Sequence, residues 1–152
     1  MSAELAVYLR NNQVILAPQG GGGGHSWDAA PPLVVEPEVA ALAPALLEAL
    51  AVSRDIRAQG TEPPADYRPA RSPVLPAIGV KSYKEFYRGA SHCSLYEEEA
   101  GGELLMFKSV PAKGGNGFDG APAPDFMETI TDRDQTAAIV LGYLRGAPAI
   151  PG

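Results

Sequence analysis

The sequence repeats itself at a shift of 91 residues. The shift places Trp27 on Phe118 and Asp28 on Asp119, in each case after a glycine-rich stretch. It also aligns, without a gap, Pro31 with Pro122, Val35 with Phe126, Val39 with Ile130, Leu50 with Leu141, and Arg54 with Arg145. Self-similarity at a fixed shift indicates two copies of one structural unit. We therefore expect Trp27 and Phe118 to be substantially buried at matching places in two related halves.

Each half is predicted to begin with a β-hairpin. Residues 4–17 contain two short β-runs around Asn11-Asn12, and asparagine tolerates the positive φ of a two-residue hairpin turn. Residues 91–110 give a second hairpin with Gly101-Gly102 at its turn.

Each half is predicted to end with a helix. In the first half, apolar residues recur at helical spacing, and Pro44 either marks the start of that helix or kinks it. This stripe consists of Leu42, Ala45, Leu46, Ala49 and Leu50. In the second half, Thr131 and Asp134 are spaced like a capping box, and Gly146 closes the helix.

Proline recurs through residues 58–80, which predicts an extended connector between the repeats 3–57 and 81–146. Just after it, Ser82 and Glu85 have the spacing of a short helix start. A chain of 152 residues fits one domain. We expect residues 1–152 to form a single α+β domain, in which two hairpin-plus-helix units pack their apolar faces together.

The net charge of −6 argues against direct nucleic-acid binding and favours a basic protein as partner. The first residues lack a cationic region followed by an apolar run, so no secretory signal is expected. No apolar run is long enough to span a membrane. The single cysteine, Cys93, cannot form an internal disulfide, which favours a reducing, cytoplasmic location.

Neither glycine-rich stretch has the pattern of a phosphate-binding loop. The run Gly20–Gly24 is followed by His-Ser instead of Lys-Ser/Thr, and Lys113 precedes its glycines. We expect the glycines before Trp27 to be exposed and mobile. His92 and Cys93 are adjacent on a predicted strand, so they point to opposite faces and do not form a catalytic pair. With two His and one Cys, no metal site is expected, and we predict no cofactor and no enzyme activity.

Carboxylates are concentrated in the second half, where they predict a docking surface for a basic partner. A purely solubilising role is the alternative. The proposed docking residues are Glu97, Glu98, Glu99, Glu103, Asp119 and Asp125.

Residues 81–146 resemble the immunity proteins of contact-dependent growth inhibition. The resemblance rests on a Lys-Ser-aromatic-Lys-x-Phe motif, a β-rich stretch, a proline, a loop ending Gly-x-Gly-Phe and a closing helix. These positions are Lys81, Ser82, Tyr83, Lys84, Phe86, Pro111, Gly115, Gly117 and Phe118. The first half matches only in outline, and none of these motifs is catalytic.

The resemblance implies a cytoplasmic protein that binds and blocks the C-terminal toxin domain of such a system, often a basic nuclease acting on tRNA. It also implies a fold similar to Whirly single-stranded DNA-binding domains. The alternative function is therefore a Whirly-like single-stranded nucleic-acid binder. Its candidate surface is basic and aromatic, and consists of Lys81, Lys84, Arg88, Tyr83, Phe86 and Tyr87.

Overall fold

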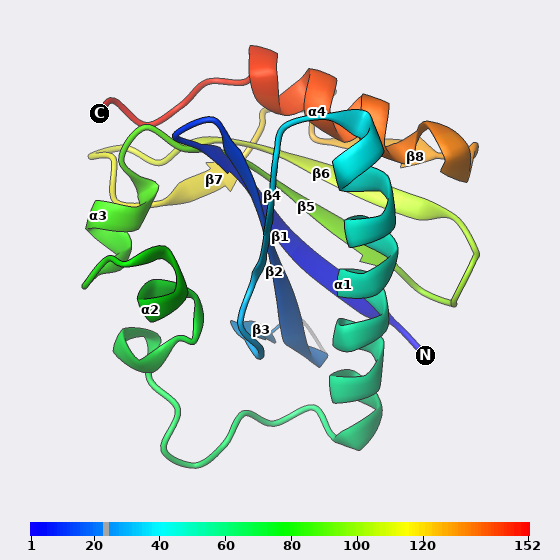
Figure 1. The fold of residues 1–152 in the computed structure, drawn as a ribbon, viewed down its shortest axis with the longest axis horizontal. Helices are drawn as coiled ribbons and strands as arrows, with labels where there is room; N and C mark the ends of the chain where they lie inside the picture. Colours follow the sequence, from blue (N-terminus) through cyan, green and yellow to red (C-terminus); the bar gives the residue numbers. More distant parts are fainter. Residues whose placement is uncertain (23–24) are drawn as a thin grey trace.

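The computed structural model describes residues 1–22 and 25–152. The fold is α+β, as predicted, with one antiparallel eight-stranded sheet and helices on both of its sides (Figure 1). The strands are β1 (Ala3–Arg10), β2 (Gln13–Gly22), β3 (His25–Asp28), β4 (Leu33–Val35), β5 (Ser91–Glu97), β6 (Leu104–Pro111), β7 (Phe118–Gly120) and β8 (Met127–Ile130). The helices are α1 (Val39–Gln59), α2 (Val74–Ile78), α3 (Tyr83–Tyr87) and α4 (Thr136–Gly146), with 3-10 turns at Pro69–Arg71 and Arg133–Gln135.

Both halves have the same order of elements, four strands followed by a long helix. The sheet order is β3-β2-β1-β5-β6-β7; β4 also pairs with β2, and β8 also pairs with β6. The halves meet where β1 and β5 pair at the centre of the sheet. Within each half, the second strand is the partner of three others, so the pairing scheme is the same in both.

The strand register agrees with the 91-residue shift. Trp27 pairs with Gly20 between β3 and β2, and Phe118 pairs with Pro111 between β7 and β6. Both members of the second pair lie 91 positions after those of the first. The two aromatic residues therefore occupy matching places, as predicted, although each ring is half-buried rather than enclosed.

The predicted turns form for the expected reasons. Asn11 and Asn12 have φ values of 51° and 59°, so the β1–β2 hairpin has the two positive φ angles of a type I′ turn. Gly101, in the β5–β6 connection, has a φ of 78°. The Ser82 side chain accepts a hydrogen bond from the Glu85 amide at 3.2 Å and caps α3.

The inner face of the sheet packs against α1 and α4. Because side chains alternate along a strand, every second residue of the central strands enters this core. Strand β5 shows a strict alternation of buried and half-buried residues over its whole length. The main strand residues of this core are Leu5, Val7, Val14, Leu16, Cys93, Leu95, Leu104 and Met106.

The outer face over β1 and β2 packs against α2 and α3. Ala6, Tyr8, Ile15 and Ala17 are buried there, and Phe86 of α3 is fully enclosed among them. In Figure 1 these two short helices lie on the opposite side of the strands from α1. The segment between α1 and β5 therefore builds a second core.

The connector differs from the extended segment predicted for residues 58–80. It contains a 3-10 turn and α2, in which Pro73 is the N-cap and Pro76 lies in the first turn. Proline is compatible with these positions because the amides of a first helical turn have no partner within the helix. The α1 helix begins at Val39, so Pro44 lies inside it and does not mark its start.

Two further local predictions were wrong. Asp132, rather than Thr131, caps the turn before α4, because its carboxylate accepts a hydrogen bond from the Asp134 amide at 3.1 Å. Gly20 and Gly21 are buried in β2, not exposed, since β2 continues through them to pair with β3. Gly23 and Gly24 lie outside the described residues. Within residues 1–22 and 25–152, none of the helices has both the length and the apolar character needed to cross a bilayer.

Candidate functional site

The outer side of the sheet is not covered evenly. Over β1 and β2 it is buried beneath α2 and α3, but over β5, β6 and β8 its side chains are half-buried or exposed. We call this second area the open face. It is formed by Ser94, Tyr96, Leu105, Phe107, Met127 and Thr129.

Strand pairing arranges the open face into two rows. In one row Tyr96 faces Leu105, which faces Thr129 on β8. In the other row Ser94 faces Phe107, which faces Met127. Residues directly opposite one another on neighbouring strands lie on the same face and in contact range. The result is a continuous surface across three strands with apolar side chains in both rows.

An aromatic ring extends the second row. Phe126, just before β8, lies with its ring centre 5.4 Å from that of Phe107. Phe126 is 44% exposed and Met127 is 45% exposed, which is high for large apolar side chains. The sequence carries a signal for this surface that the predicted docking site did not include. Strand β6 has apolar residues on both of its faces. Leu104 and Met106 lie in the inner core, and Leu105 and Phe107 lie on the open face.

The turn between β5 and β6 carries exposed carboxylates at one end of the open face. We call Glu98, Glu99 and Glu103 the acidic tip. A hollow of about 330 Å³ lies between the tip and the rows, lined by Tyr96, Glu98, Glu99, Gly102, Glu103 and Leu105. The Tyr96 hydroxyl donates a hydrogen bond to Glu98, which raises the pKa of Tyr96 above its ordinary value. The acidic tip and the open face are therefore one continuous surface.

Two positively charged groups lie near the acidic tip and Tyr96. The terminal amine of Met1 pairs with Glu99 at 2.7 Å, with both groups largely exposed. Arg57 lies 5.8 Å from the centre of the Tyr96 ring, near the half-buried Glu4 of β1. The Met1 amine neutralises only one of the three carboxylates, so the acidic tip keeps a net negative charge.

Glu97 does not belong to the docking surface, contrary to the prediction. It is fully buried and pairs with Arg54 of α1 and, at 2.7 Å, with Arg133 before α4. The alternation of β5 turns Glu97 inward, on the same face as Cys93 and Leu95. Burial alone would raise the pKa of Glu97, but the hydrogen bonds from the two arginines outweigh it and hold the pKa below its ordinary value.

Asp119 and Asp125 are exposed but lie away from the acidic tip. Asp119 is opposite Val110, six residues along β6 from Leu104 at the tip end. At a rise of about 3.3 Å per residue this is a separation of about 20 Å. Asp125 follows in the loop before Phe126. The predicted carboxylates therefore stand at both ends of the open face and do not form one cluster.

Cys93 and His92 point to opposite faces, as predicted. Burial raises the pKa of the Cys93 thiol to about 12, so the thiol is protonated at neutral pH and is a poor nucleophile. Burial also lowers the pKa of His92 to about 4. The imidazole lies between Tyr8 and Phe118, with Nδ1 2.8 Å from the Ser109 hydroxyl. In the described part of the chain, no three His, Cys, Asp or Glu side chains come together as a metal site.

The basic-aromatic segment of α3 uses its rings for packing. Phe86 is fully buried, and its ring centre lies 4.7 Å from that of Tyr8. Tyr83 and Tyr87 are half-buried beside it, whereas Lys81, Lys84 and Arg88 are exposed. A buried ring cannot stack on a nucleic-acid base, so Phe86 is not available for the stacking that the alternative function requires, and Tyr83 and Tyr87 are the remaining aromatic side chains of this surface.

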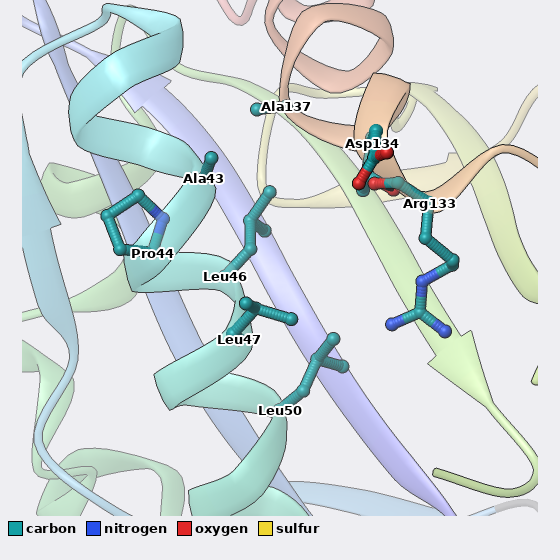
Figure 2. A pocket seen from close by; sticks show the side chains of 9 residues that line it. Ala43, Pro44, Leu46, Leu47, Leu50, Arg133, Asp134 and Ala137 are labelled. Atoms are coloured by element: carbon teal, nitrogen blue, oxygen red, sulfur yellow. Dashed lines mark hydrogen bonds between the residues drawn. The ribbon is translucent and has the colours of Figure 1, made fainter. Parts of the chain in front are cut away.

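An apolar groove that the sequence did not predict lies between α1 and the start of α4 (Figure 2). Its volume is about 340 Å³. Figure 2 shows Leu46, Leu47 and Leu50 along the α1 wall, with Arg133 and Asp134 on the other side. Leu47 is 66% exposed and lies off the buried stripe of α1. Thr136 also lines the groove, but its hydroxyl donates a hydrogen bond to the Arg133 carbonyl oxygen at 2.8 Å.

The comparisons with known proteins identify the fold only. No protein-family model matches the chain, and neither does any curated protein sequence. Among solved structures, the chain is similar to the protein of unknown function NMB0488 from Neisseria meningitidis, with a TM-score of 0.65 and 14% sequence identity. The match covers 95% of each chain. This likeness supports the α+β architecture over its whole length.

Proposed function

We propose that this chain is an immunity protein of a contact-dependent growth inhibition system, which binds and neutralises the C-terminal toxin domain. The observation that carries the proposal is the open face, whose apolar rows continue into the acidic tip. The resemblance of residues 81–146 to such immunity proteins supplies the class of partner. The proposal places the chain in the cytoplasm, where the target of the toxin lies.

The chemistry of the open face suits a protein partner. Protein interfaces have an apolar centre enriched in aromatic residues and methionine, with a polar border. Tyr96, Phe107, Phe126 and Met127 supply such a centre, and the carboxylates at its two ends supply the border. A nucleic acid fits this surface poorly, because stacking platforms for single strands are bordered by cations that neutralise phosphates.

The acidic tip suits a nuclease in particular. A domain that binds RNA presents lysine and arginine side chains to the phosphates. Glu98, Glu99 and Glu103 would meet those cations, while the apolar rows exclude water and cover the cleft. The charges would raise the association rate and select the partner, whereas the rows would slow dissociation.

The test uses the toxin domain encoded beside this protein, with association and dissociation rates measured by surface plasmon resonance at increasing salt. The triple variant E98K/E99K/E103K should lower the association rate at least about tenfold and weaken its salt dependence. The exposed Met127→Ser change should mainly raise the dissociation rate.

A matched control reverses three exposed carboxylates on the α1 side of the molecule, in the triple variant E36K/E48K/D55K. This control changes the net charge equally and should leave both rates close to those of the wild type. Equal losses of association rate in both triple variants would mean that net charge alone causes the effect. That result would contradict the proposed docking site. Failure of the wild-type chain to bind or inhibit the toxin domain would contradict the proposed immunity function itself.

A further inference from the structure

A second site lies on the outer side of the first half, around Asp28. This carboxylate at the end of β3 is only 8% exposed. Its Oδ1 accepts a hydrogen bond from Gln19 Nε2 at 2.7 Å, and its Oδ2 accepts from Ser72 Oγ at 2.6 Å and from the Tyr83 hydroxyl. Three segments distant in sequence therefore converge on one carboxylate: β2, the connector and α3.

The charge of Asp28 has no protein counterion in the part of the chain that the structure describes: no Lys or Arg side chain there lies within ion-pairing distance of it. All three side-chain donors are neutral groups. Burial, and then the hydrogen bond to Asp28, raise the pKa of Tyr83 well above its ordinary value of 10.0, so its hydroxyl remains a donor. Buried charges are normally paired, so an unpaired one identifies a place where a cation would be favourable.

Asp28 lies at an open cleft with aromatic walls. The cleft has a volume of about 400 Å³, and Asp28, Trp27, Tyr67, Tyr83 and Tyr87 are among its lining residues. The ring centres of Trp27 and Tyr67 are 5.6 Å apart, and those of Tyr83 and Tyr87 are 5.3 Å apart. The cleft therefore combines two pairs of aromatic rings with one buried anion.

We propose that this cleft binds an organic cation, a guanidinium or alkylammonium group on a short aliphatic stem. The faces of aromatic rings attract cations, and Trp and Tyr do so most strongly. The Asp28 charge adds a long-range attraction that the low polarity of the walls leaves poorly screened. A cavity of this volume fits a ligand of about the size of one amino acid.

Hydrogen bonding within the fold does not account for the whole arrangement. The contacts of Asp28 with Gln19, Ser72 and Tyr83 hold the connector and α3 on the sheet. That role requires neither the open cleft nor the ring of Tyr67 against Trp27. The matching place in the second half lacks such an arrangement, because Asp119 is exposed there opposite Val110. The inference does not depend on the proposed toxin.

Trp27 is the only tryptophan of the chain and lines the cleft, so its fluorescence reports on binding. The full chain is titrated with N-acetyl-arginine methylamide, with the neutral citrulline analogue and with agmatine. Saturable quenching or a spectral shift by the cationic compounds, but not by the citrulline analogue, is expected. Tighter binding of the capped arginine would indicate a protein side chain as the natural ligand, and tighter binding of agmatine would indicate a free amine.

Variants separate binding from folding. Asp28→Asn should weaken cation binding at least about tenfold, whereas Asp119→Asn, the matching change in the second half, should leave it unchanged. Tyr67→Ala removes one wall from a half-buried position on the connector and should weaken binding by about three- to tenfold while the chain stays folded. The proposal is overturned if no cation gives a saturable change with the folded wild-type chain. Equal binding of the citrulline analogue, or unchanged binding by Tyr67→Ala, would overturn it as well.

Discussion

The outer face of the sheet is covered in the first half of the molecule and open in the second. The two halves share their order of strands and helix and the register around Trp27 and Phe118. They differ because α2 of the connector, together with α3 just after it, folds back over β1 and β2. Residues that match in the sequence therefore have different surroundings.

Asp28 and Asp119 show this difference most clearly. Both follow the aromatic residue of the short third strand, 91 positions apart. Asp28 is buried under the connector and accepts three hydrogen bonds, whereas Asp119 is exposed to solvent. The comparison teaches that a repeated unit can present two different surfaces when a single non-repeated segment covers one copy.

The largest effect is expected where α3 attaches to the sheet. Phe86→Ala should lower the free energy of unfolding by about 3–5 kcal/mol, because it removes a fully buried ring that holds α3 on the sheet. Phe107→Ala, on the open face, should cost only about 1 kcal/mol, since that ring is already half in solvent. Urea unfolding of both variants measures the difference. Equal losses would mean that the two outer faces are packed alike.

The next effect concerns the junction between the halves. Glu97→Gln should cost about 3 kcal/mol, because Arg54 from the first half and Arg133 from the second lose their shared counterion while both remain mostly buried. Glu98→Gln is the matched change on the exposed neighbour and should alter stability by less than about 0.5 kcal/mol. Similar values for the two would show that the ion pairs contribute nothing to joining the halves.

The contribution of Glu97 should also depend on pH. Its pKa is lower in the folded chain than the ordinary value of 4.5, so the ionised form is favoured by folding. The stabilisation is therefore complete above the unfolded pKa and is lost as the pH falls through the lower, folded pKa. The stability difference between wild type and Glu97→Gln should thus shrink in acid, as measured by urea unfolding at a series of pH values below neutrality. A difference that stays constant down to the lowest pH would contradict this account.

The smallest effect compares two glycines against aromatic rings. A Cβ at Gly20 would lie 2.5 Å from the Trp27 ring, and one at Gly120 would lie 2.6 Å from the Phe126 ring. Gly20→Ala should cost about 1–2 kcal/mol, because Trp27 is held between Gly20 and Tyr67. Gly120→Ala should cost less than about 0.5 kcal/mol, since the exposed Phe126 can turn into solvent. Thermal unfolding and Trp27 fluorescence of the two variants measure these costs in stability. A greater loss of stability for Gly120→Ala than for Gly20→Ala would contradict the expected order.

Much of the secondary structure was predictable from local patterns. The Asn11-Asn12 turn, the Ser82 cap and the end of α4 at Gly146 each depend on a few neighbouring residues, and all three form as expected. The repeated prolines of the connector predict an extended segment and not the α2 helix. Pro76 lies within the first turn of α2, where the missing amide hydrogen costs no hydrogen bond within the helix.

The candidate site was less predictable. A run of glutamates predicts an acidic surface, but only strand parity decides which members face outward. The parity of β5 turns Glu97 inward between two arginines and leaves Glu98 and Glu99 at the turn. The apolar residues at both parities of β6 indicate an apolar outer face, but whether that face stays open depends on how little of β5, β6 and β8 the segment between α1 and β5 covers.

Local sequence patterns specify the repeated unit, its hairpins and its closing helices, because turn conformation and the spacing of apolar residues are local properties. Packing between distant segments specifies which charges are buried and which apolar rows remain open, and it places Asp28, but not Asp119, at an aromatic cleft. These outcomes depend on how the connector packs across the sheet. Burial is a property of surfaces brought together from distant parts of the chain, so it is settled only when the whole fold forms.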